Sequence, residues 1–256
     1  MTDYKAKERE HYNSRYTIYN GSAITENDSD LVNKNAINHF YQYVIDIQSV
    51  LGSGRILDYG CGIGDKSTSV LHPEWTLDGI DISEESIAIA QRKYAQDINV
   101  SFSVMDCENT TFPDNTFDLI FDYGSFSSID IKKAIKEITR ILKPNGTLIA
   151  IETLGHNPIL NFKRRISVFT GRRTRWASTH IMRIQNWQYI QKYFRISKIS
   201  HFNILAIYIS PFLGIMPKHT REVMLKRIWS IDKALLKNKN LSKYAFKSVA
   251  CLQVLK

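Results

Sequence analysis

The sequence predicts an α/β fold with a mostly parallel, seven-stranded sheet that carries helices on both faces. Three observations lead to this prediction. Short apolar runs alternate with amphipathic stretches over residues 55–152, a glycine-rich turn follows the first run, and acidic residues recur where the runs end. In an open parallel sheet, ligands bind beyond the carboxyl ends of the strands. We therefore expect the functional site at that edge of the sheet.

The elements follow from hydrophobic periodicity and from turn signals. A helix over 31–51 has apolar residues at helical spacing and ends near Gly52. Ser83 is the expected cap of an amphipathic helix that carries Ile87, Ala90 and Tyr94. A third helix, 131–142, should be ended by Lys-Pro-Asn-Gly at 143–146, because proline cannot continue it. The strands expected between these helices are 55–59, 77–82, 100–105, 117–121 and 147–152.

The composition changes after Thr153, where Arg, Lys, Trp and Ile become frequent. Helices are expected at 157–169, 187–194 and 220–236, and a basic loop, GRRTRW, follows the first of them. Strands at 195–202 and 248–255 should complete the sheet as a hairpin-like pair. We expect one domain over 1–256, made of N-terminal lid helices (1–50), a cofactor-binding core (51–155) and a basic substrate-side insertion with the terminal strands (156–256).

Composition narrows the class of protein. A chain of 256 residues with 43% hydrophobic content can bury a full core. The start is polar, and no apolar run approaches the roughly 20 residues that span a bilayer, so we expect a cytoplasmic protein. The three cysteines, Cys61, Cys107 and Cys251, are far apart and suggest neither a disulfide framework nor a metal site.

The net charge of +9 conceals a strong asymmetry. Residues 1–155 hold 14 Lys and Arg against 23 Asp and Glu, a net charge of −9. Residues 156–256 hold 20 against only Glu222 and Asp232, a net charge of +18. This cationic part either keeps the chain in solution or binds an anionic partner.

The stretch RILDYGCGIGDKS, 55–67, is a short apolar strand that enters a loop with glycines at 60, 62 and 64. Glycine permits positive φ and lets a ligand approach the backbone, and the N–H groups of this loop are expected to face outward as a cradle for a nucleotide-like ligand. The spacing differs from that of dinucleotide sites, and no Gly-Lys-Ser/Thr follows, which excludes a P-loop. Because a glycine triplet alone is weak evidence, the neighbouring acidic residues decide the ligand.

Four carboxylates, Asp58, Asp81, Asp106 and Asp122, fall at or just beyond predicted strand ends. A single acid at such a place is usually a helix cap, but four in one crevice favour a binding site. Asp81 lies 23 residues after Asp58, near the separation at which an acid binds the ribose hydroxyls, and Asp106 would accept from an adenine amino group. An acid-lined crevice suits a ligand with ammonium and sulfonium cations, which S-adenosylmethionine carries.

The runs ILDYGCGIGDKS, GIDIS, VMDCENTTFPDNTFDLIF and EITRILKPNGTLIAIE, in that order, resemble the class I S-adenosylmethionine-dependent methyltransferases, whose fold is Rossmann-like. The resemblance covers about residues 55–152. It implies that Asp81 binds the ribose, that Ile82 packs on the adenine, and that Asp106 and Cys107 meet the adenine edge. The residues that it places at the methionine end of the cofactor are Asp58, Gly60, Cys61, Gly62 and Gly64.

The segment EREHYNSRY near the start is similar to the aromatic-bearing helix that covers the cofactor in related enzymes. This similarity makes Tyr12 a candidate cofactor contact. Tyr12, Tyr16 and Tyr19 are also at helical spacing, so packing in the core is the alternative explanation.

Methyl transfer needs close approach, alignment and exclusion of water, and an oxygen acceptor also needs a base. Many relatives have a His-His pair where this chain has Ser127-Ser128, and an Asn/Asp-Pro-Pro-Tyr motif is missing. The segments ETLGHNPILNFKRR and THIMR resemble a bacterial subgroup with Gly-His-Asn-Pro after the fifth strand. We therefore predict His156 as the first catalytic candidate and His180 as the second, although His156 also fits a place at the start of a capped helix.

The acceptor is expected to be an anionic small molecule or lipid-linked compound that receives the methyl group at an oxygen or a nitrogen. Residues 204–216 are apolar, and they either pack against the added strands or form an interfacial element beside cationic residues. Alternatives are an RNA methyltransferase that uses the basic half and a non-catalytic S-adenosylmethionine-binding partner protein. The arginines that would bind an anionic soluble substrate are Arg164, Arg165, Arg172, Arg173 and Arg175.

Overall fold

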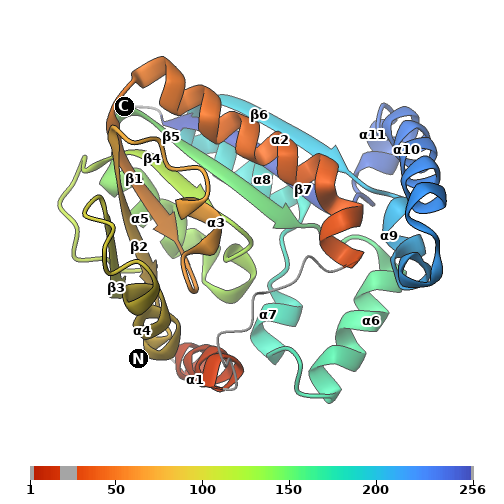
Figure 1. Cartoon of the computed structure of the whole chain (residues 1–256), viewed down its shortest axis with the longest axis horizontal. Coiled ribbons are helices and arrows are strands. Elements are labelled where there is room, and N and C mark those ends of the chain that lie inside the picture. The colour runs from red at the N-terminus through yellow and green to blue at the C-terminus, as the bar shows by residue number, and fades with distance from the viewer. Residues whose placement is uncertain (1–2, 18–27, 255–256) are drawn as a thin grey trace.

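A computed structural model describes residues 3–17 and 28–254 (Figure 1). Its seven strands form one sheet in the order β3-β2-β1-β4-β5-β7-β6. Strands β1 to β5 pair in parallel, whereas β7 is antiparallel to both β5 and β6. The predicted α/β class and mostly parallel sheet are therefore confirmed. The strands are β1 Gly54–Tyr59, β2 Trp75–Asp81, β3 Val100–Val104, β4 Phe117–Asp122, β5 Leu142–Thr153, β6 Phe194–Phe202 and β7 Lys247–Val254.

Helices cover both faces of the sheet (Figure 1). The α-helices are α1 Asp3–Thr17, α2 Asp28–Leu51, α3 Asp65–Thr68, α4 Glu84–Lys93, α5 Ile131–Ile141, α6 Pro158–Phe169, α7 Arg175–Thr179, α8 Ile184–Ile190, α9 Ala206–Ile209, α10 Lys218–Leu235 and α11 Lys239–Ser242. Short 3₁₀ turns are η1 Phe126–Ser128, η2 Gln191–Tyr193 and η3 Ser210–Ile215. The predicted terminal pair of strands is present, and the connection between its members includes α10, near the helix predicted over 220–236.

Two apolar clusters hold these layers together. On one face, Phe40 and Val44 of α2 pack with Leu119 and Ile149 of the central strands. On the other face, α5 and α8 bury their apolar sides with the same strands. Each fully buried aliphatic or aromatic side chain contributes about 1.5–3 kcal/mol, so these faces fix the strands whose ends build the site.

Two predicted boundaries differ from the structure. Lys-Pro-Asn-Gly at 143–146 was expected to separate a helix from a strand, but β5 already begins at Leu142, which pairs with Phe117. The four residues form an irregularity within β5, where the register shifts and Asn145 has a φ of 64°. The helix predicted over 187–194 instead runs from Ile184 to Ile190 and continues as a 3₁₀ turn. The side chain of Asn186 accepts a hydrogen bond from the Arg183 N–H at 2.9 Å, which favours the earlier start.

The apolar segment 204–216 forms α9 and η3. Ala206 and Leu213 are buried against Val32 of α2 and Leu225 of α10. One interpretation of the sequence had this segment packing against the terminal strands, but it packs on helices instead. Phe212 and Ile215 stay exposed. Within the described ranges, no helix combines the length and the apolar character needed to cross a bilayer.

Candidate functional site

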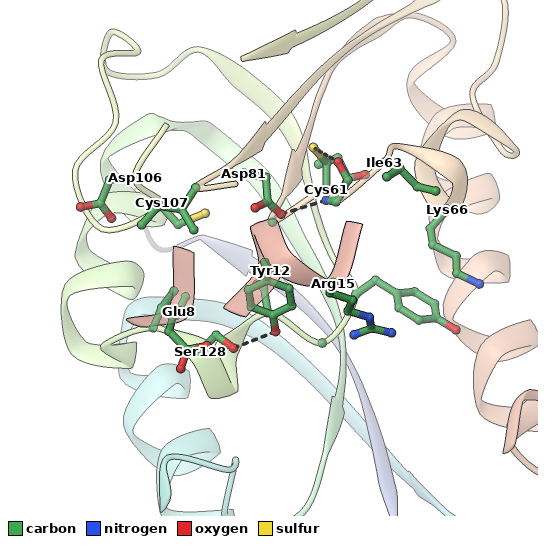
Figure 2. Close-up of a pocket in the computed structure, with 18 of the residues that line it drawn as sticks. Glu8, Tyr12, Arg15, Cys61, Ile63, Lys66, Asp81, Asp106, Cys107 and Ser128 are labelled. Carbon is green, nitrogen blue, oxygen red and sulfur yellow. Dashed lines mark hydrogen bonds between the residues drawn. The ribbon is translucent and has the colours of Figure 1, made fainter. Parts of the chain in front are cut away.

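A cavity of about 320 Å³ lies at the carboxyl ends of β1, β2 and β4 (Figure 2). One side of it is formed by the glycine loop after β1 and by the segments after β2 and β3. The opposite side is formed by α1, which lies across the strand ends (Figures 1 and 2). Of the predicted cofactor-binding residues, those that line the cavity are Tyr12, Asp58, Gly60, Cys61, Gly62, Asp81, Ile82, Asp106 and Cys107.

The glycine loop follows β1 with positive φ at Gly60, Gly62 and Gly64 (80°, 53° and 79°). Its N–H groups do not face outward as expected. Those of Gly60 and Cys61 both donate to the Ile80 carbonyl at 2.9 Å, and that of Gly62 donates to Asp81 Oδ2 at 2.9 Å. The loop therefore offers a ligand close backbone approach and few free donors at these positions.

Packing also requires two of these glycines. A Cβ on Gly64 would lie 2.5 Å from Phe102 Cζ, and one on Gly60 would lie 2.6 Å from Ser125 Cβ. Phe102 is buried under the loop and cannot easily move. The glycine pattern thus reflects the packing of the loop on β3 as much as the approach of a ligand.

We expect Gly64→Ala to lower the free energy of unfolding by about 2–4 kcal/mol, because it adds left-handed backbone strain to overpacking against Phe102. Gly171→Ala is the matched control, since Gly171 has a φ of 70° but nothing within 4 Å of a Cβ. Urea unfolding of both variants measures the difference. Equal losses would show that the contact with Phe102 contributes nothing.

Asp81 ends β2 and points its carboxylate at the centre of the cavity (Figure 2). Its Oδ1 accepts from the Ser83 N–H at 2.9 Å, and its Oδ2 accepts from the Gly62 N–H at 2.9 Å. Burial raises the pKa of Asp81, and these two N–H groups oppose that effect. Each oxygen keeps a second lone pair, so the carboxylate can also accept from two ligand hydroxyls.

Asp58 is the last residue but one of β1, beside the same cavity, and is almost fully buried. The Ser67 hydroxyl donates to its Oδ2. Burial, together with the charge of Asp81, raises the pKa of Asp58 to about 7 despite that hydrogen bond. The group therefore changes charge near neutral pH, and a cationic ligand would favour its ionised form.

Because Asp58 titrates near pH 7, the affinity for a cationic cofactor should rise by up to roughly tenfold between pH 6 and pH 8. Affinity rises with pH because the Asp58 carboxyl is neutral below its pKa, so that binding of a cation there must release a proton. Calorimetric titration of S-adenosylmethionine in buffers of different ionisation enthalpy measures that proton. Asp58→Asn should remove both effects, and an unchanged pH profile in this variant would contradict the assignment.

The predicted adenine-edge residues are tied to α1. Lys5 Nζ lies 2.5 Å from Asp106 Oδ2 and 2.8 Å from Glu108 Oε2, and the Tyr4 hydroxyl donates to Glu108 Oε1. Burial would lower the pKa of Lys5, but its hydrogen bonds to these two carboxylates outweigh burial and raise it. Burial raises the pKa of the Cys107 thiol well above its usual value, so the thiol is neutral. An adenine would therefore meet Asp106 with Lys5 already bound to it.

Further contacts hold α1 over the cavity as a lid. Its Asn13 side chain donates to Glu84 Oε2 at 3.0 Å and accepts from the Ser83 hydroxyl at 2.7 Å. The Tyr12 hydroxyl lies 3.1 Å from Ser128 Oγ (Figure 2). Tyr12 thus lines the cavity, as predicted from the similarity, while Tyr19 and the side chain of Tyr16 lie outside the described part of the chain.

Glu8 is a site residue that the sequence analysis missed. Its carboxylate is buried, and its Oε1 accepts from the Thr174 hydroxyl at the start of α7. Its Oε2 has no hydrogen-bond partner among the described residues, although Glu8 lines the cavity. Burial raises the pKa of Glu8. Helical spacing is the signal that would have found it, because Lys5, Glu8, Tyr12 and Arg15 share one face of α1 and all line the cavity.

Asp122 lies beneath the cavity and does not line it. It is fully buried at the end of β4, where its Oδ1 accepts from the N–H and the hydroxyl of Ser125, a residue that does line the cavity. Burial and the charge of Glu152 raise its pKa well above the usual range. Gly64 likewise supports the loop without lining the cavity. Asp122 affects the site through Ser125, and Gly64 affects it through the packing of the loop on Phe102.

Neither of the two predicted catalytic histidines, His156 and His180, lines the cavity. His156 Nε2 accepts from the Ile184 N–H at 3.0 Å, and burial together with Arg183 lowers its pKa. His180 is exposed and stacks on Trp176 with 3.5 Å between ring centroids. His156 therefore contacts the start of α8 and His180 contacts α7. The catalytic role of both residues stays a prediction.

Two of the arginines proposed as substrate contacts bind the chain itself. Arg164 is buried and donates to the Leu154 carbonyl at 3.0 Å, and burial lowers its pKa to about 10. Arg173 donates to Ser127 Oγ and to the Ala177 carbonyl, both at 3.2 Å. Arg164 thus joins α6 to the end of β5, and Arg173 joins the segment before α7 to the loop after β4.

Comparison with known proteins shows what the core is similar to. A sequence profile described as "Methyltransferase domain" matches residues 56–146. A ubiquinone/menaquinone biosynthesis C-methyltransferase of Geobacter sulfurreducens is 30% identical over 106 residues, which are 39% of this chain and 41% of that protein. A demethylmenaquinone methyltransferase of Staphylococcus aureus is 33% identical over 103 residues, 39% and 43% of the two chains. The chain thus spans less than half the length of these curated relatives.

Two solved structures share the fold. Phosphoethanolamine N-methyltransferase 2 of Haemonchus contortus, in complex with S-adenosyl-L-methionine, has a TM-score of 0.55 at 19% identity, over 80% of this chain and 49% of that chain. The YcgJ protein of Bacillus has a TM-score of 0.54 at 20% identity, over 86% and 99% of the two chains. Residues 56–146 thus match the profile of a methyltransferase domain, and the chain shares the fold of these two solved structures.

Proposed function

We propose that this chain transfers the methyl group of S-adenosylmethionine to an oxygen or nitrogen of a small-molecule or lipid-linked acceptor. The observation that carries the proposal is the cavity in which the buried carboxylates of Asp58 and Glu8 and the half-buried carboxylate of Asp81 meet the glycine loop and the helix α1. Such a cavity suits a cationic nucleoside that must be shielded from water. When bound, S-adenosylmethionine supplies an electrophilic methyl group.

The residues divide the cavity into parts that fit the cofactor. Asp81 would accept from the ribose hydroxyls, and Asp106 and Cys107 lie on the adenine side. Asp58 would pair with the ammonium group. Arg15 and Lys66 line the opposite end from Asp106 (Figure 2), where cations suit a carboxylate.

Glu8 is the group that we assign to the acceptor. It joins the cofactor cavity to the C-terminal part through Thr174, and its Oε2 is left for a ligand. A raised pKa makes its carboxylate a better proton acceptor than an exposed one. The proton that leaves the acceptor O–H or N–H would pass to Glu8 Oε2, while the freed lone pair forms the new bond to the methyl carbon. The methyl–sulfur bond would break at the same time, and its electron pair would stay on the sulfur of the departing S-adenosylhomocysteine. Tyr12 and Ser128 would hold the acceptor in line.

A carbon acceptor is the second candidate, and one observation favours it. The Geobacter relative is named a C-methyltransferase of quinone biosynthesis. A carbon that loses a proton on methylation would use the same base. The acceptor would then be a carbon of a quinone-like compound.

Transfer of a radiolabelled methyl group from S-adenosylmethionine into a host extract tests the proposal. We expect label in the lipid or the soluble small-molecule fraction, with Asp81→Ala as the blank. Label confined to RNA would replace the proposal with the RNA methyltransferase alternative. Cofactor binding without transfer to any fraction would identify a non-catalytic partner protein.

A further inference from the structure

Helix α6 displays a continuous apolar stripe to solvent. Its exposed large hydrophobic side chains are Ile159, Phe162, Ile166 and Phe169, with exposed fractions of 62%, 66%, 49% and 94%. The spacing of three, four and three residues places them on one face of the helix. Single exposed apolar residues are ordinary, but a row of four that includes two phenylalanines marks an interaction surface.

The opposite face of α6 anchors the helix to the body. Leu160 and Arg164 are buried there, and Arg164 Nη2 donates to the Leu154 carbonyl at 3.0 Å. At the start of the helix, Asn157 caps two N–H groups and donates to the Tyr208 hydroxyl of α9 at 2.5 Å. The stripe is therefore held outward by a fixed helix at the rim of the molecule (Figure 1).

Basic residues surround the stripe. Lys163 and Arg165 are exposed on its two sides, and Arg172 follows the helix. The sequence holds no Asp or Glu from 156 to 221. Two copies of this surface would bring cation against cation, which disfavours self-association through it. An apolar stripe between cations matches a bilayer with anionic headgroups.

We propose that α6 docks on the surface of a membrane that contains anionic phospholipids. The four apolar side chains enter the boundary between headgroups and acyl chains, and Lys163, Arg165 and Arg172 pair with lipid phosphates. The helix lies flat on the surface and does not cross the bilayer.

Docking through α6 would bring the cavity close to the membrane. The segment that follows α6 contacts the site where Thr174 donates to Glu8, and it contacts the neighbour of a lining residue where Arg173 donates to Ser127. A lipid-linked acceptor could thus reach Glu8 from the docked side. This link to the acceptor rests on the proposed function, whereas the docking itself does not.

Co-sedimentation with vesicles tests the proposal without any methyl transfer. The full chain is mixed with vesicles of phosphatidylcholine alone or with about one third phosphatidylglycerol. We expect binding to the anionic vesicles only. The double variant Phe162→Ser and Phe169→Ser should bind at least tenfold more weakly, and Lys163→Ser with Arg165→Ser should lose the preference for anionic vesicles. Ile98→Ser is the matched control and should bind as the wild type does. Ile98 is 97% exposed and lies two residues before β3, a strand that is on the opposite side of the view from α6 (Figure 1).

Three outcomes would overturn the proposal: no wild-type binding to anionic vesicles, undiminished binding of the double phenylalanine variant, or a concentration-dependent dimer in ultracentrifugation that this variant abolishes. The last outcome would assign the stripe to a second copy of the chain. Calorimetry with S-adenosylmethionine on the same variants separates the two claims, since a docking variant should keep full cofactor affinity.

Discussion

Replacing Asp81 with alanine is expected to weaken S-adenosylmethionine binding by at least about 100-fold. The carboxylate of Asp81 faces the cavity with one lone pair on each oxygen beyond those used by Ser83 and Gly62. Two hydrogen bonds from ribose hydroxyls to a charged acceptor contribute about 1.5–3 kcal/mol each. Their joint loss, about 3 kcal/mol or more, corresponds to roughly two orders of magnitude in Kd.

Isothermal titration calorimetry measures the effect, and Asp78→Ala serves as the control. Asp78 belongs to the same strand, but its carboxylate pairs with Arg55 at 2.6 Å and lies outside the cavity. The control should keep wild-type affinity. Circular dichroism and a thermal melt establish that Asp81→Ala is folded. Wild-type affinity in a folded Asp81→Ala protein would remove the basis for placing the ribose at β2.

Glu8→Gln is expected to lower kcat for methyl transfer to an oxygen or nitrogen acceptor by about 10²–10³, with little change in cofactor affinity. General acid–base catalysis contributes 10²–10⁴ in typical enzymes. The glutamine keeps the shape of the side chain and the contact with Thr174, but it cannot take up a proton. The loss should therefore appear in kcat and not in the Kd for S-adenosylmethionine.

Glu10→Gln is the matched control on the same helix, because Glu10 is exposed and does not line the cavity. It should transfer methyl groups at the wild-type rate. At saturating S-adenosylmethionine, where protonation of Asp58 no longer limits binding, kcat of the wild type should also fall as pH drops and Glu8 becomes protonated. This fall should be missing in Glu8→Gln. Retention of the full rate and of the fall at low pH in Glu8→Gln would mean that another group takes the proton.

The sheet was predictable because short stretches of sequence, each read by itself, indicate its strands and helices. Strand β1 reads as a short apolar run before glycines, and α5 shows its buried face at helical spacing, so both were placed to within a few residues. The beginning of β5 was not found, because proline and glycine at 144 and 146 are ordinary breakers, and only pairing with Phe117 extends the strand through them.

Site residues were predictable where an acidic residue stands at or near a strand end and can bind the ligand directly, as for Asp58 and Asp81. Glu8 was missed because its burial depends on Thr174, which lies 166 residues away in the chain. Asp122 was predicted as a cofactor contact from the same strand-end pattern, and only the structure shows that Ser125 lies between it and the cavity. Long-range packing decides such cases, and no local pattern encodes it.

Titration of S-adenosylmethionine into the wild-type chain tests the central claim most directly. We predict one cofactor per chain, competition by S-adenosylhomocysteine, and release of a proton from Asp58 below pH 7. No binding heat at cofactor concentrations in the millimolar range, together with an unchanged melting temperature, would contradict the assignment of this cavity to S-adenosylmethionine.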